Sequence, residues 1–581
     1  MTGSNRRCPG ALADPGRRRV LGAGAAAIAA AGLPFASSRA QAEGSGFDQM
    51  ADVVVVGAGA AGASAAWHAR RAGLEVLVLE KAPAPGGTAA KSVGGIWVPA
   101  NRFLVAAGID DARADALRYM ARLSWPQSYD PAHPRYGADA AGFELLAAYY
   151  DQAQRVFGGL ESAGVLRLDN QFGPDLTMPD YYAHLPENAV PSGRALVPVT
   201  PDGQIGNGAE LMRQFAAALA AARIPVQRRC RAERLLQDAG RAVTGLEYSD
   251  REGQRRRVGA RRGVIFASGG FTHDADLCRQ FLKGPVFGGC AVPTAEGDFV
   301  RIAQAAGAQL GNMSNAWWCQ IPLDQALEHR SVPTGIWCSP GDSMLQVDAR
   351  GARFMNEKFV YNERTQRQFA WDPVSGSYPQ LLSFMVYDAR CARQYAGFAP
   401  IPPEGAAAAH VYSGGTLREL AAALDARLRE IAPHTGGAAL APDFAERLEA
   451  TVARFNGFAA AGQDADFARG ETPIEPFFHF FGPRREFDNP LPNPTLHPLA
   501  SQGPYYAVIL VPGTLDTKGG PRIDRHARVL DPWGEPIPGL YGAGNCIASP
   551  TGPAYWAGGA TLGPAITFGA LAARHAARRG V

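Results

Sequence analysis

Cysteine is scarce in this sequence, and it shows none of the spacings that cysteine-bound cofactors require. No pair of cysteines forms a CxxC or a CxxCH motif. The eight cysteines are Cys8, Cys230, Cys278, Cys290, Cys319, Cys338, Cys391 and Cys546. This pattern excludes an iron–sulfur cluster, a c-type haem and a redox-active dithiol. The eleven histidines also lack metal-ligand spacing, so we predict no metal site.

An excess of charge of one sign is also absent. The 57 lysines and arginines nearly balance the 54 aspartates and glutamates, which leaves a formal net charge of +3. A nucleic-acid partner is therefore not indicated. After the first 42 residues we expect no transmembrane segment, because no apolar run there has the length that spans a bilayer. The length of 581 residues is sufficient for two or more domains.

The N-terminus has the pattern of an export signal. Three arginines at positions 17–19 precede an alanine-rich apolar run that ends near Leu33, and Ala40-Gln41-Ala42 follows. A charged segment, an apolar segment and a small-residue cleavage site predict a signal peptide over residues 1–42, and the arginine pair is typical of the twin-arginine type. We therefore expect a periplasmic protein that is exported after folding. The alternative is a basic extension on a cytoplasmic protein.

A dinucleotide-binding pattern follows the leader. The apolar run 53–56 leads into Gly57, Gly59 and Gly62, and a second apolar run ends in Glu80. Gly57 allows a tight turn, Gly59 lets the backbone approach a pyrophosphate, and Gly62 permits close packing of helix on strand. Glu80 is placed to accept hydrogen bonds from the ribose hydroxyls. Because the pyrophosphate is favoured at a helix N-terminus, this order of elements predicts an FAD site.

The chain is predicted to have an α/β fold, in which a Rossmann-like FAD-binding domain contains an inserted α+β substrate (catalytic) domain. Segments near residues 51–82, 206–270 and 539–578 have the pattern of a single nucleotide-binding domain, because their apolar strands end in small residues. The intervening part is richer in aromatic residues and includes a helical run over 416–431. The predicted boundaries give the FAD-binding domain residues 51–293 and 497–581 and the substrate domain residues 294–496.

Several further motifs resemble those of the fumarate reductase/succinate dehydrogenase flavoprotein superfamily, and within it those of the 3-ketosteroid Δ1-dehydrogenases. The motifs are Gly86-Gly87-Thr88, Gly94-Gly95-Ile-Trp97-Val-Pro99, Ala267-Ser-Gly-Gly270-Phe271, Ala316-Trp317-Trp318, Arg353-Phe-Met-Asn356-Glu357, Gly513-Thr-Leu-Asp-Thr517-Lys518-Gly519-Gly520, Pro538-Gly539-Leu-Tyr541-Gly-Ala-Gly544-Asn545 and Thr561-Leu-Gly563-Pro564. The likeness covers nearly all of the chain after the leader.

The resemblance implies FAD as the cofactor and a set of residues that hold it. These are Gly57, Gly59, Ala61, Gly62, Glu80, Lys81, Gly87, Thr88, Ser92, Gly94, Gly95, Ala267, Gly269, Gly544, Asn545, Thr561 and Leu562. The histidine that bonds covalently to FAD in the respiratory enzymes falls at Thr88, so we expect noncovalent FAD.

The resemblance also implies a catalytic set of three tyrosines and one glycine. An aspartate–tyrosine pair after a proline in the ketosteroid dehydrogenases is matched by the sequence at 179–181, which ends in Tyr181, with Tyr182 as an adjacent competitor. Tyr361 matches a second tyrosine just past the Asn-Glu loop. Tyr555, with Gly559 four residues later, matches the third tyrosine and its glycine.

The chemistry of ketone desaturation explains these residue types. A proton leaves the α carbon, and a hydride passes from the β carbon to flavin N5. The developing enolate needs hydrogen-bond donors, which the Tyr555 hydroxyl and the Gly559 N–H would supply. Tyr361 would act as the base with the help of Tyr181. Since an unperturbed tyrosine has a pKa of about 10, we expect neighbouring groups to lower it.

The same comparison leaves alternatives for the substrate. Fumarate and succinate enzymes place a carboxylate-binding arginine where this chain has Trp556, and an indole cannot replace a guanidinium in that contact. Trp125 and Trp556 are bulky enough to shrink the site for a smaller ketone such as a cyclohexanone. Trp317 and Trp318 are interpreted as packing residues.

Our prediction is an FAD-dependent desaturase of a hydrophobic cyclic ketone, most simply 1,2-desaturation of a 3-ketosteroid. Reduced flavin would pass its electrons to an external acceptor such as a quinone. The alternatives are a small-ring ketone desaturase and, from another class, a fumarate-type alkene reductase. A non-catalytic electron-shuttle protein is disfavoured by the ordered catalytic set.

Overall fold

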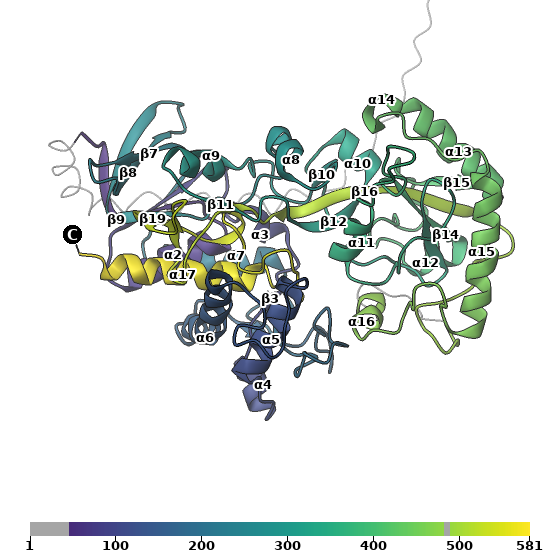
Figure 1. The fold of residues 1–581 in the computed structure, drawn as a ribbon, viewed down its shortest axis with the longest axis horizontal. Coiled ribbons are helices and arrows are strands. Elements are labelled where there is room, and N and C mark those ends of the chain that lie inside the picture. Colours follow the sequence, from purple (N-terminus) through teal and green to yellow (C-terminus); the bar gives the residue numbers. More distant parts are fainter. Residues whose placement is uncertain (1–45, 481–488, 581) are drawn as a thin grey trace, which may run out of the picture.

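The computed structural model describes residues 46–480 and 489–580 of the chain (Figure 1). The predicted signal peptide over residues 1–42 lies outside the described residues. Among the described residues, no helix has both the length and the apolar character needed to span a bilayer.

The first of two large sheets is parallel at its centre and has the strand order β18-β19-β9-β1-β2-β6, with the hairpin β7-β8 beside β9. Its strands are β1 (Gln49–Val56), β2 (Val76–Glu80), β6 (Val226–Arg228), β7 (Arg231–Gln237), β8 (Val243–Ser249), β9 (Arg255–Phe266), β18 (Arg528–Leu530) and β19 (Pro536–Gly542). The run 53–56 is apolar throughout because both faces of β1 are covered, which is typical of a central parallel strand. The predicted α/β class is confirmed.

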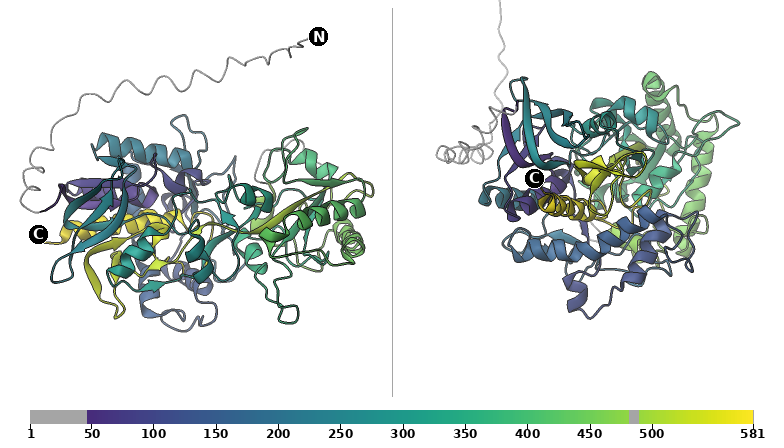
Figure 2. Two further views of the ribbon diagram at one scale, coloured as in Figure 1. Left: turned by 90° about the horizontal axis from the view of Figure 1, so that it is seen from above. Right: turned by 60° about the vertical axis from the view of Figure 1, so that its left-hand side comes forward.

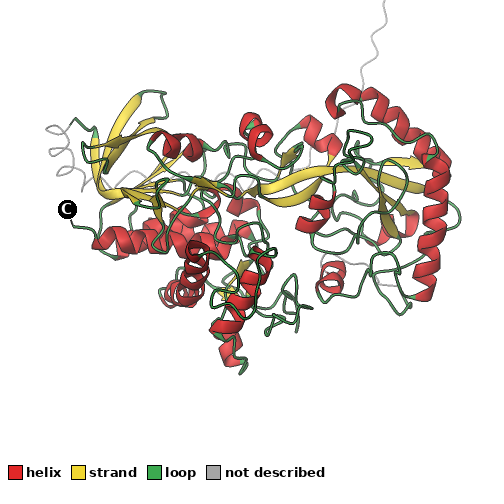
Figure 3. Ribbon diagram, viewed as in Figure 1, coloured by secondary structure: helices red, strands yellow, loops and turns green. Residues whose placement is uncertain are grey.

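Helices bring distant parts of the chain onto this sheet. Helix α2 (Ala60–Arg71) follows β1, and α17 (Leu562–Arg578) packs along it from the other end of the sequence (Figure 3). A Cβ at Gly569 would collide with the carbonyl oxygen of Ala61, so the two helices approach closely at this glycine. The other elements of this half are α3 (Gly87–Lys91), α7 (Gly208–Ala221), α8 (Ala275–Phe281), α9 (Asp298–Ala305), β11 (Leu310–Gly311), β17 (Gly520–Pro521) and the 3-10 turn η2 (Gly544–Cys546).

The second sheet is built around the long strand β16 (Tyr505–Thr517), which runs from the middle of the molecule into its far half (Figure 1). The remaining strands are β10 (Gly288–Gly289), β12 (Ala316–Pro322), β13 (Met344–Val347), β14 (Ser383–Asp388) and β15 (Tyr412–Gly414). Both β10 and β16 lie outside the predicted substrate range 294–496, yet they pair within this sheet. Its helices are α10 (Leu323–Glu328), α11 (Tyr361–Arg367), α12 (Ala389–Gln394), α13 (Leu417–Glu430), α14 (Ala432–Thr435), α15 (Phe444–Ala461) and α16 (Ile474–Phe480).

A third layer lies beside α17 on the side away from the first sheet (Figure 2). It contains α4 (Arg102–Ala106), α5 (Arg113–Ser124), α6 (Ala140–Ser162) and the small sheet β3-β5-β4, formed by Ile96–Trp97, Ala195–Pro198 and Leu168–Asp169. The loop that carries Tyr181 follows β4. This layer therefore brings Tyr181 toward the space between the two large sheets.

Candidate active site

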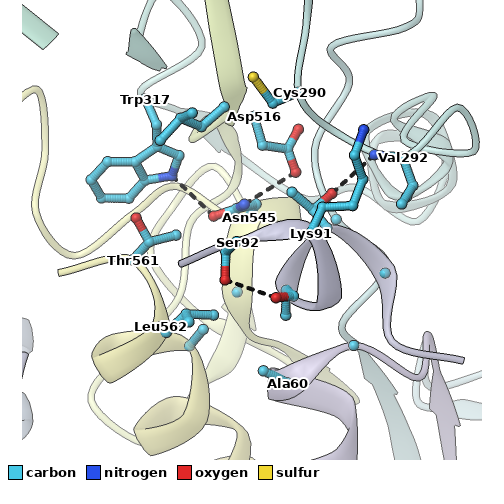
Figure 4. A pocket seen from close by; sticks show the side chains of 18 of the residues that line it. Ala60, Lys91, Ser92, Cys290, Val292, Trp317, Asp516, Asn545, Thr561 and Leu562 are labelled. Atoms are coloured by element: carbon cyan, nitrogen blue, oxygen red, sulfur yellow. Dashed lines mark hydrogen bonds between the residues drawn. The ribbon is translucent and has the colours of Figure 1, made fainter. Parts of the chain in front are cut away.

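One long cavity joins the carboxyl ends of the first sheet to the space between the two large sheets. All the residues predicted to hold the cofactor line it, with the exception of Gly62. Figure 4 shows part of its wall, where Ser92 follows α3, Asn545 lies in η2, and Thr561 and Leu562 lie at the start of α17. The four predicted catalytic residues line the same cavity.

The glycine turn after β1 has the geometry that close approach of a phosphate requires. Gly57 has a φ of +104°, which a residue with a side chain rarely adopts. A Cβ at Gly62 would collide with the carbonyl oxygen of Gly57, so Gly62 acts in the packing of α2 against the turn rather than in the cavity wall. Gly59 precedes α2, whose first amides face the cavity side with no capping side chain. This arrangement suits an anion.

Glu80 ties the turn to the end of β2. Its carboxylate accepts hydrogen bonds from the backbone N–H groups of Ala58 and Ala82, both at 2.7 Å. Burial raises the pKa of Glu80, and these two hydrogen bonds oppose the rise. Lys81 beside it donates to Asp298 at 3.0 Å and also pairs with Glu296. The acidic position predicted for the ribose contact therefore lies at the cavity edge with a fixed orientation.

A network of side chains in the cavity wall links the sequence motifs that contain Gly270, Asp516 and Asn545. The buried Asp516 accepts from the N–H of Gly270 at 3.0 Å and from the Asn545 amide at 3.1 Å. Asn545 in turn accepts from the indole N–H of Trp317 at 3.0 Å (Figure 4). Thr88 accepts from the N–H of Val292 at 3.3 Å and offers no imidazole.

The three predicted catalytic tyrosines meet although they lie far apart in the sequence. The hydroxyls of Tyr181 and Tyr361 are 2.8 Å apart in a hydrogen bond. The ring of Tyr555 lies 5.1 Å from that of Tyr181 and 5.6 Å from that of Tyr361, measured between centroids. All three are buried. Tyr182 does not line the cavity and instead packs against Phe359, so Tyr181 is the residue placed in the site.

The expected lowering of the tyrosine pKa by neighbouring groups is wrong for the residues that this chain supplies. Burial raises the pKa of Tyr361 and of Tyr181 well above 10, and the neighbouring tyrosines add to the rise at Tyr361. Burial also raises the pKa of Tyr555, while its hydrogen bonds oppose this. The physical reason is that the described wall holds no cation close enough to outweigh the loss of solvent. The three hydroxyls therefore stay protonated at rest, so they can donate hydrogen bonds, and their phenolate forms are disfavoured.

Gly559 is held with its backbone exposed to the cavity. Its φ is +93°, and a Cβ at this position would collide with the N–H groups of Ile96 and Trp97. Within the described part of the chain, the Gly559 N–H donates no hydrogen bond. Thr561 donates to the Tyr555 hydroxyl at 3.5 Å. A free amide and a phenol thus face the same space, as a developing oxyanion requires.

Trp556 and Trp125 do not narrow the cavity, contrary to the possibility raised by their size. Trp556 is fully buried behind it, where its indole N–H donates to Ser124 at 3.0 Å. Its carbonyl accepts from the N–H of Tyr181 at 3.1 Å and so joins the segments that carry two of the predicted catalytic residues. Trp125, at the end of α5, packs against Gly142 of α6.

Several lining residues escaped the sequence analysis. The apolar wall around the tyrosines includes Phe172, Met178, Trp337, Phe477 and Phe478. The adjacent phenylalanines at 477 and 478 were the one visible signal. Trp317 also lines the cavity, so its interpretation as a packing residue is incomplete, whereas Trp318 does pack, against Phe369 at 4.9 Å between ring centroids. No arginine is among the described residues of the wall.

Comparison with known proteins agrees with this geometry. Residues 52–562 match the model of the FAD binding domain family. The chain is 32% identical to 4-oxocyclohexanecarboxylate 2-dehydrogenase of Sinomonas cyclohexanicum, over 90% of this chain and 92% of the relative. It is also 32% identical to 3-oxosteroid 1-dehydrogenase of Mycobacterium tuberculosis, over 90% and 98%.

A solved structure of the same kind is also similar. The crystal structure of 3-ketosteroid delta1-dehydrogenase from Sterolibacterium denitrificans, in complex with 1,4-androstadiene-3,17-dione, superimposes with a TM-score of 0.76 at 27% identity. The match covers 91% of this chain and 99% of that one. The chain therefore shares the overall fold of that dehydrogenase.

Proposed function

Because the chain belongs to the FAD binding domain family, we propose that its cavity desaturates a cyclic ketone next to the carbonyl group, with a 3-ketosteroid as the first-choice substrate. The cofactor is FAD, and the enzyme is a dehydrogenase that acts on CH–CH groups. One observation carries the proposal: Tyr181, Tyr361, Tyr555 and the free N–H of Gly559 converge on one apolar space.

The residues of the cavity fit FAD. Gly57 makes the tight turn, the absence of a side chain at Gly59 leaves room for the pyrophosphate, and Glu80 lines the cavity where a ribose would lie. Thr88 in place of a histidine supports noncovalent attachment. When bound, FAD supplies the acceptor for the hydride that leaves the β carbon of the substrate.

The chain's own residues then handle the proton and the carbonyl. Tyr361 in its ionised form takes the proton from the α carbon, and the Tyr181 hydroxyl, 2.8 Å away, stabilises that phenolate by donating a hydrogen bond to it. Tyr555 and the Gly559 N–H donate to the ketone oxygen as negative charge develops there. The aromatic wall keeps water away, which strengthens both donor contacts.

The lining supports a neutral ring as substrate. Trp125 and Trp556 lie outside the cavity, so neither indole closes it to a large ring system such as a steroid. The absence of arginine from the described wall disfavours a dicarboxylate, and with it the fumarate-type reductase. A small cyclic ketone is the second candidate, because one relative at 32% identity is named for a cyclohexanone carboxylate.

We also propose an electron acceptor and a cellular location for the protein. The electrons would leave to an external acceptor such as a quinone. Export in the folded state would follow from the arginine-rich leader over residues 1–42, since a protein that encloses FAD is best loaded before export.

Bleaching of the flavin separates the candidate substrates. The FAD-loaded protein is mixed without oxygen with androstenedione, with cyclohexanone and with 4-oxocyclohexanecarboxylate, and the loss of flavin absorbance is followed. We expect androstenedione to bleach it fastest. Faster bleaching by a small ketone would make a small cyclic ketone, rather than a steroid, the first-choice substrate. Fumarate-dependent reoxidation of the reduced flavin would instead support the reductase.

Replacement of Tyr555 tests the proposed oxyanion contact. We expect Tyr555→Phe to retain FAD and to lower turnover by about 10²–10³-fold, because one donor to the enolate is lost. Tyr182→Phe is the matched control and should leave turnover unchanged, since Tyr182 lies outside the cavity. Equal turnover in Tyr555→Phe and the parent protein would remove Tyr555 from the mechanism.

A further inference from the structure

A fully buried lysine lies behind the part of the cavity wall that contains Tyr555, and it has no role in the proposed reaction steps. Lys518 follows the end of β16 and has no exposed surface. Its amino group donates to the carbonyl oxygen of Ala554 at 2.6 Å. No carboxylate of the described residues lies within ion-pair distance of it. Burial lowers the pKa of Lys518 well below its usual range, and the contacts of its amino group define what this side chain does.

The second contact of Lys518 is the face of Trp317. Its Nζ lies 3.7 Å from the centroid of that ring, so the amino group packs directly on the π face. The same ring meets Tyr555 edge to face, with 4.6 Å between centroids. The indole N–H of Trp317 is fixed in turn by Asn545 at 3.0 Å. Trp317 therefore has one side on the lysine and another on the catalytic phenol.

These contacts reach Tyr555 by two independent routes. The first is the backbone, because the carbonyl that Lys518 holds belongs to Ala554, the residue directly before Tyr555. The second is the side chain, because Trp317 sits between the amino group and the Tyr555 ring. Loss of the amino group would free both the segment and the ring that set the direction of the hydroxyl.

We propose that Lys518 is a positioning residue for Tyr555, which it holds in the direction of the ketone oxygen through the Ala554 carbonyl and the Trp317 ring. The inference rests on the proposed function, in which Tyr555 donates to the enolate. A displacement of about 1 Å can lower a rate on the order of 10²-fold when the moved group acts in the transition state. Lys518 thus contributes to the rate without contact with the substrate.

Lys358 provides a matched control. It is likewise a buried lysine of the second large sheet's half, and its amino group donates to the carbonyl oxygen of Ser339 at 2.5 Å. Burial lowers its pKa to about 7, and burial lowers that of Lys518 as well. Lys358 does not line the cavity, and neither of the two routes to Tyr555 begins at it. Removal of its amino group reports the general cost of changing a buried lysine.

The experiment is a double-mutant cycle measured on the FAD-loaded protein. Lys518→Met, Lys358→Met and Tyr555→Phe are made singly, and each lysine variant is combined with Tyr555→Phe. The rate of flavin reduction at saturating ketone is measured, together with FAD content and substrate affinity. We expect Lys518→Met to slow reduction about tenfold to 10²-fold. In the Tyr555→Phe background it should add almost nothing, because its effect passes through that hydroxyl.

The outcomes distinguish failure of the Lys518 inference from failure of the proposed function. The inference is overturned if Lys518→Met leaves the rate unchanged. It is also overturned if Lys518→Met lowers the rate by the same factor with and without Tyr555→Phe, as we expect of Lys358→Met. Both outcomes leave the proposed function standing. An unchanged rate in Tyr555→Phe alone overturns both. Should Lys518→Met fail to load FAD, Trp317→Phe replaces it, since that change breaks the Asn545 contact and weakens the contact with Lys518. The effects of Trp317→Phe and Tyr555→Phe on the rate of flavin reduction must then be non-additive.

Discussion

At the scale of single residues, the proton chemistry of the site depends on hydroxyls whose pKa is raised. Tyr361 is buried and hydrogen-bonded to Tyr181, and both effects of its surroundings favour the protonated phenol. A base with a pKa above 10 is mostly protonated at neutral pH. Turnover therefore draws on the small fraction of the protein in which Tyr361 is ionised.

This gives a prediction for the pH profile. The raised pKa means that Tyr361 is mostly protonated at neutral pH and that its ionised fraction grows as the pH increases. The rate of flavin reduction should therefore rise about tenfold per pH unit until the pH reaches the pKa of Tyr361. Tyr361→Phe should lower the rate and remove this slope, whereas Tyr182→Phe should keep it. The measurement is single-turnover flavin reduction between about pH 6 and about pH 10, which approaches the ordinary tyrosine pKa. A plateau near neutral pH would contradict a tyrosine base.

At the scale of secondary-structure elements, the FAD half depends on the close crossing of α2 and α17. The crossing is possible because Gly569 has no side chain at the point where α17 meets the Ala61 carbonyl. Both helices contribute residues to the cavity, Ala60 and Ala61 from one and Leu562 and Ala565 from the other. A shift of either helix would therefore change the cofactor site as well as the packing.

Gly569→Ala tests this crossing. The added methyl group must push the helices apart, and we expect it to lower the free energy of unfolding by about 1–3 kcal/mol and to weaken FAD binding. Gly457→Ala is the control, because Gly457 lies in α15 with open space around it. That change should raise stability by about 1 kcal/mol through helix propensity. Urea unfolding and FAD titration give both quantities, and equal stability of the two variants would argue against a tight crossing.

At the scale of the whole molecule, the cavity belongs to neither half alone. The first sheet supplies the glycine turn and Glu80, the second sheet supplies Trp317 and Asp516, and the third layer supplies Tyr181. β16 passes from the second sheet to the cavity and carries Asp516 near its end. A cofactor in this space would contact every layer and connect them.

Removal of FAD should therefore lower the stability of the entire protein. A ligand at about 100 times its Kd stabilises the folded state by about 2.7 kcal/mol. We expect the FAD-depleted protein to unfold at a lower temperature and to regain its Tm when FAD is added, with NAD at the same concentration as the control. An unchanged Tm after depletion and reloading would show that the cavity does not bind FAD as described.

The sequence alone was sufficient for much of this protein because its key signals are local. A strand, a glycine turn, a helix and an acidic residue within about thirty positions follow from backbone geometry, so the FAD site and the α/β class could be predicted. The positions of Tyr181, Tyr361 and Tyr555 came from motif likeness, since no local rule connects residues so distant.

Only the tertiary structure decided which residues meet. It brought Tyr181 rather than Tyr182 to the cavity, moved Trp556 behind it, placed Phe477 and Phe478 in its wall, and set Lys518 against Trp317. It also showed that burial raises the pKa of Tyr361, which the sequence could not indicate. The physical reason is the same in each case: burial and contact between distant segments depend on how the layers pack, whereas local sequence fixes only the path of the backbone within each element.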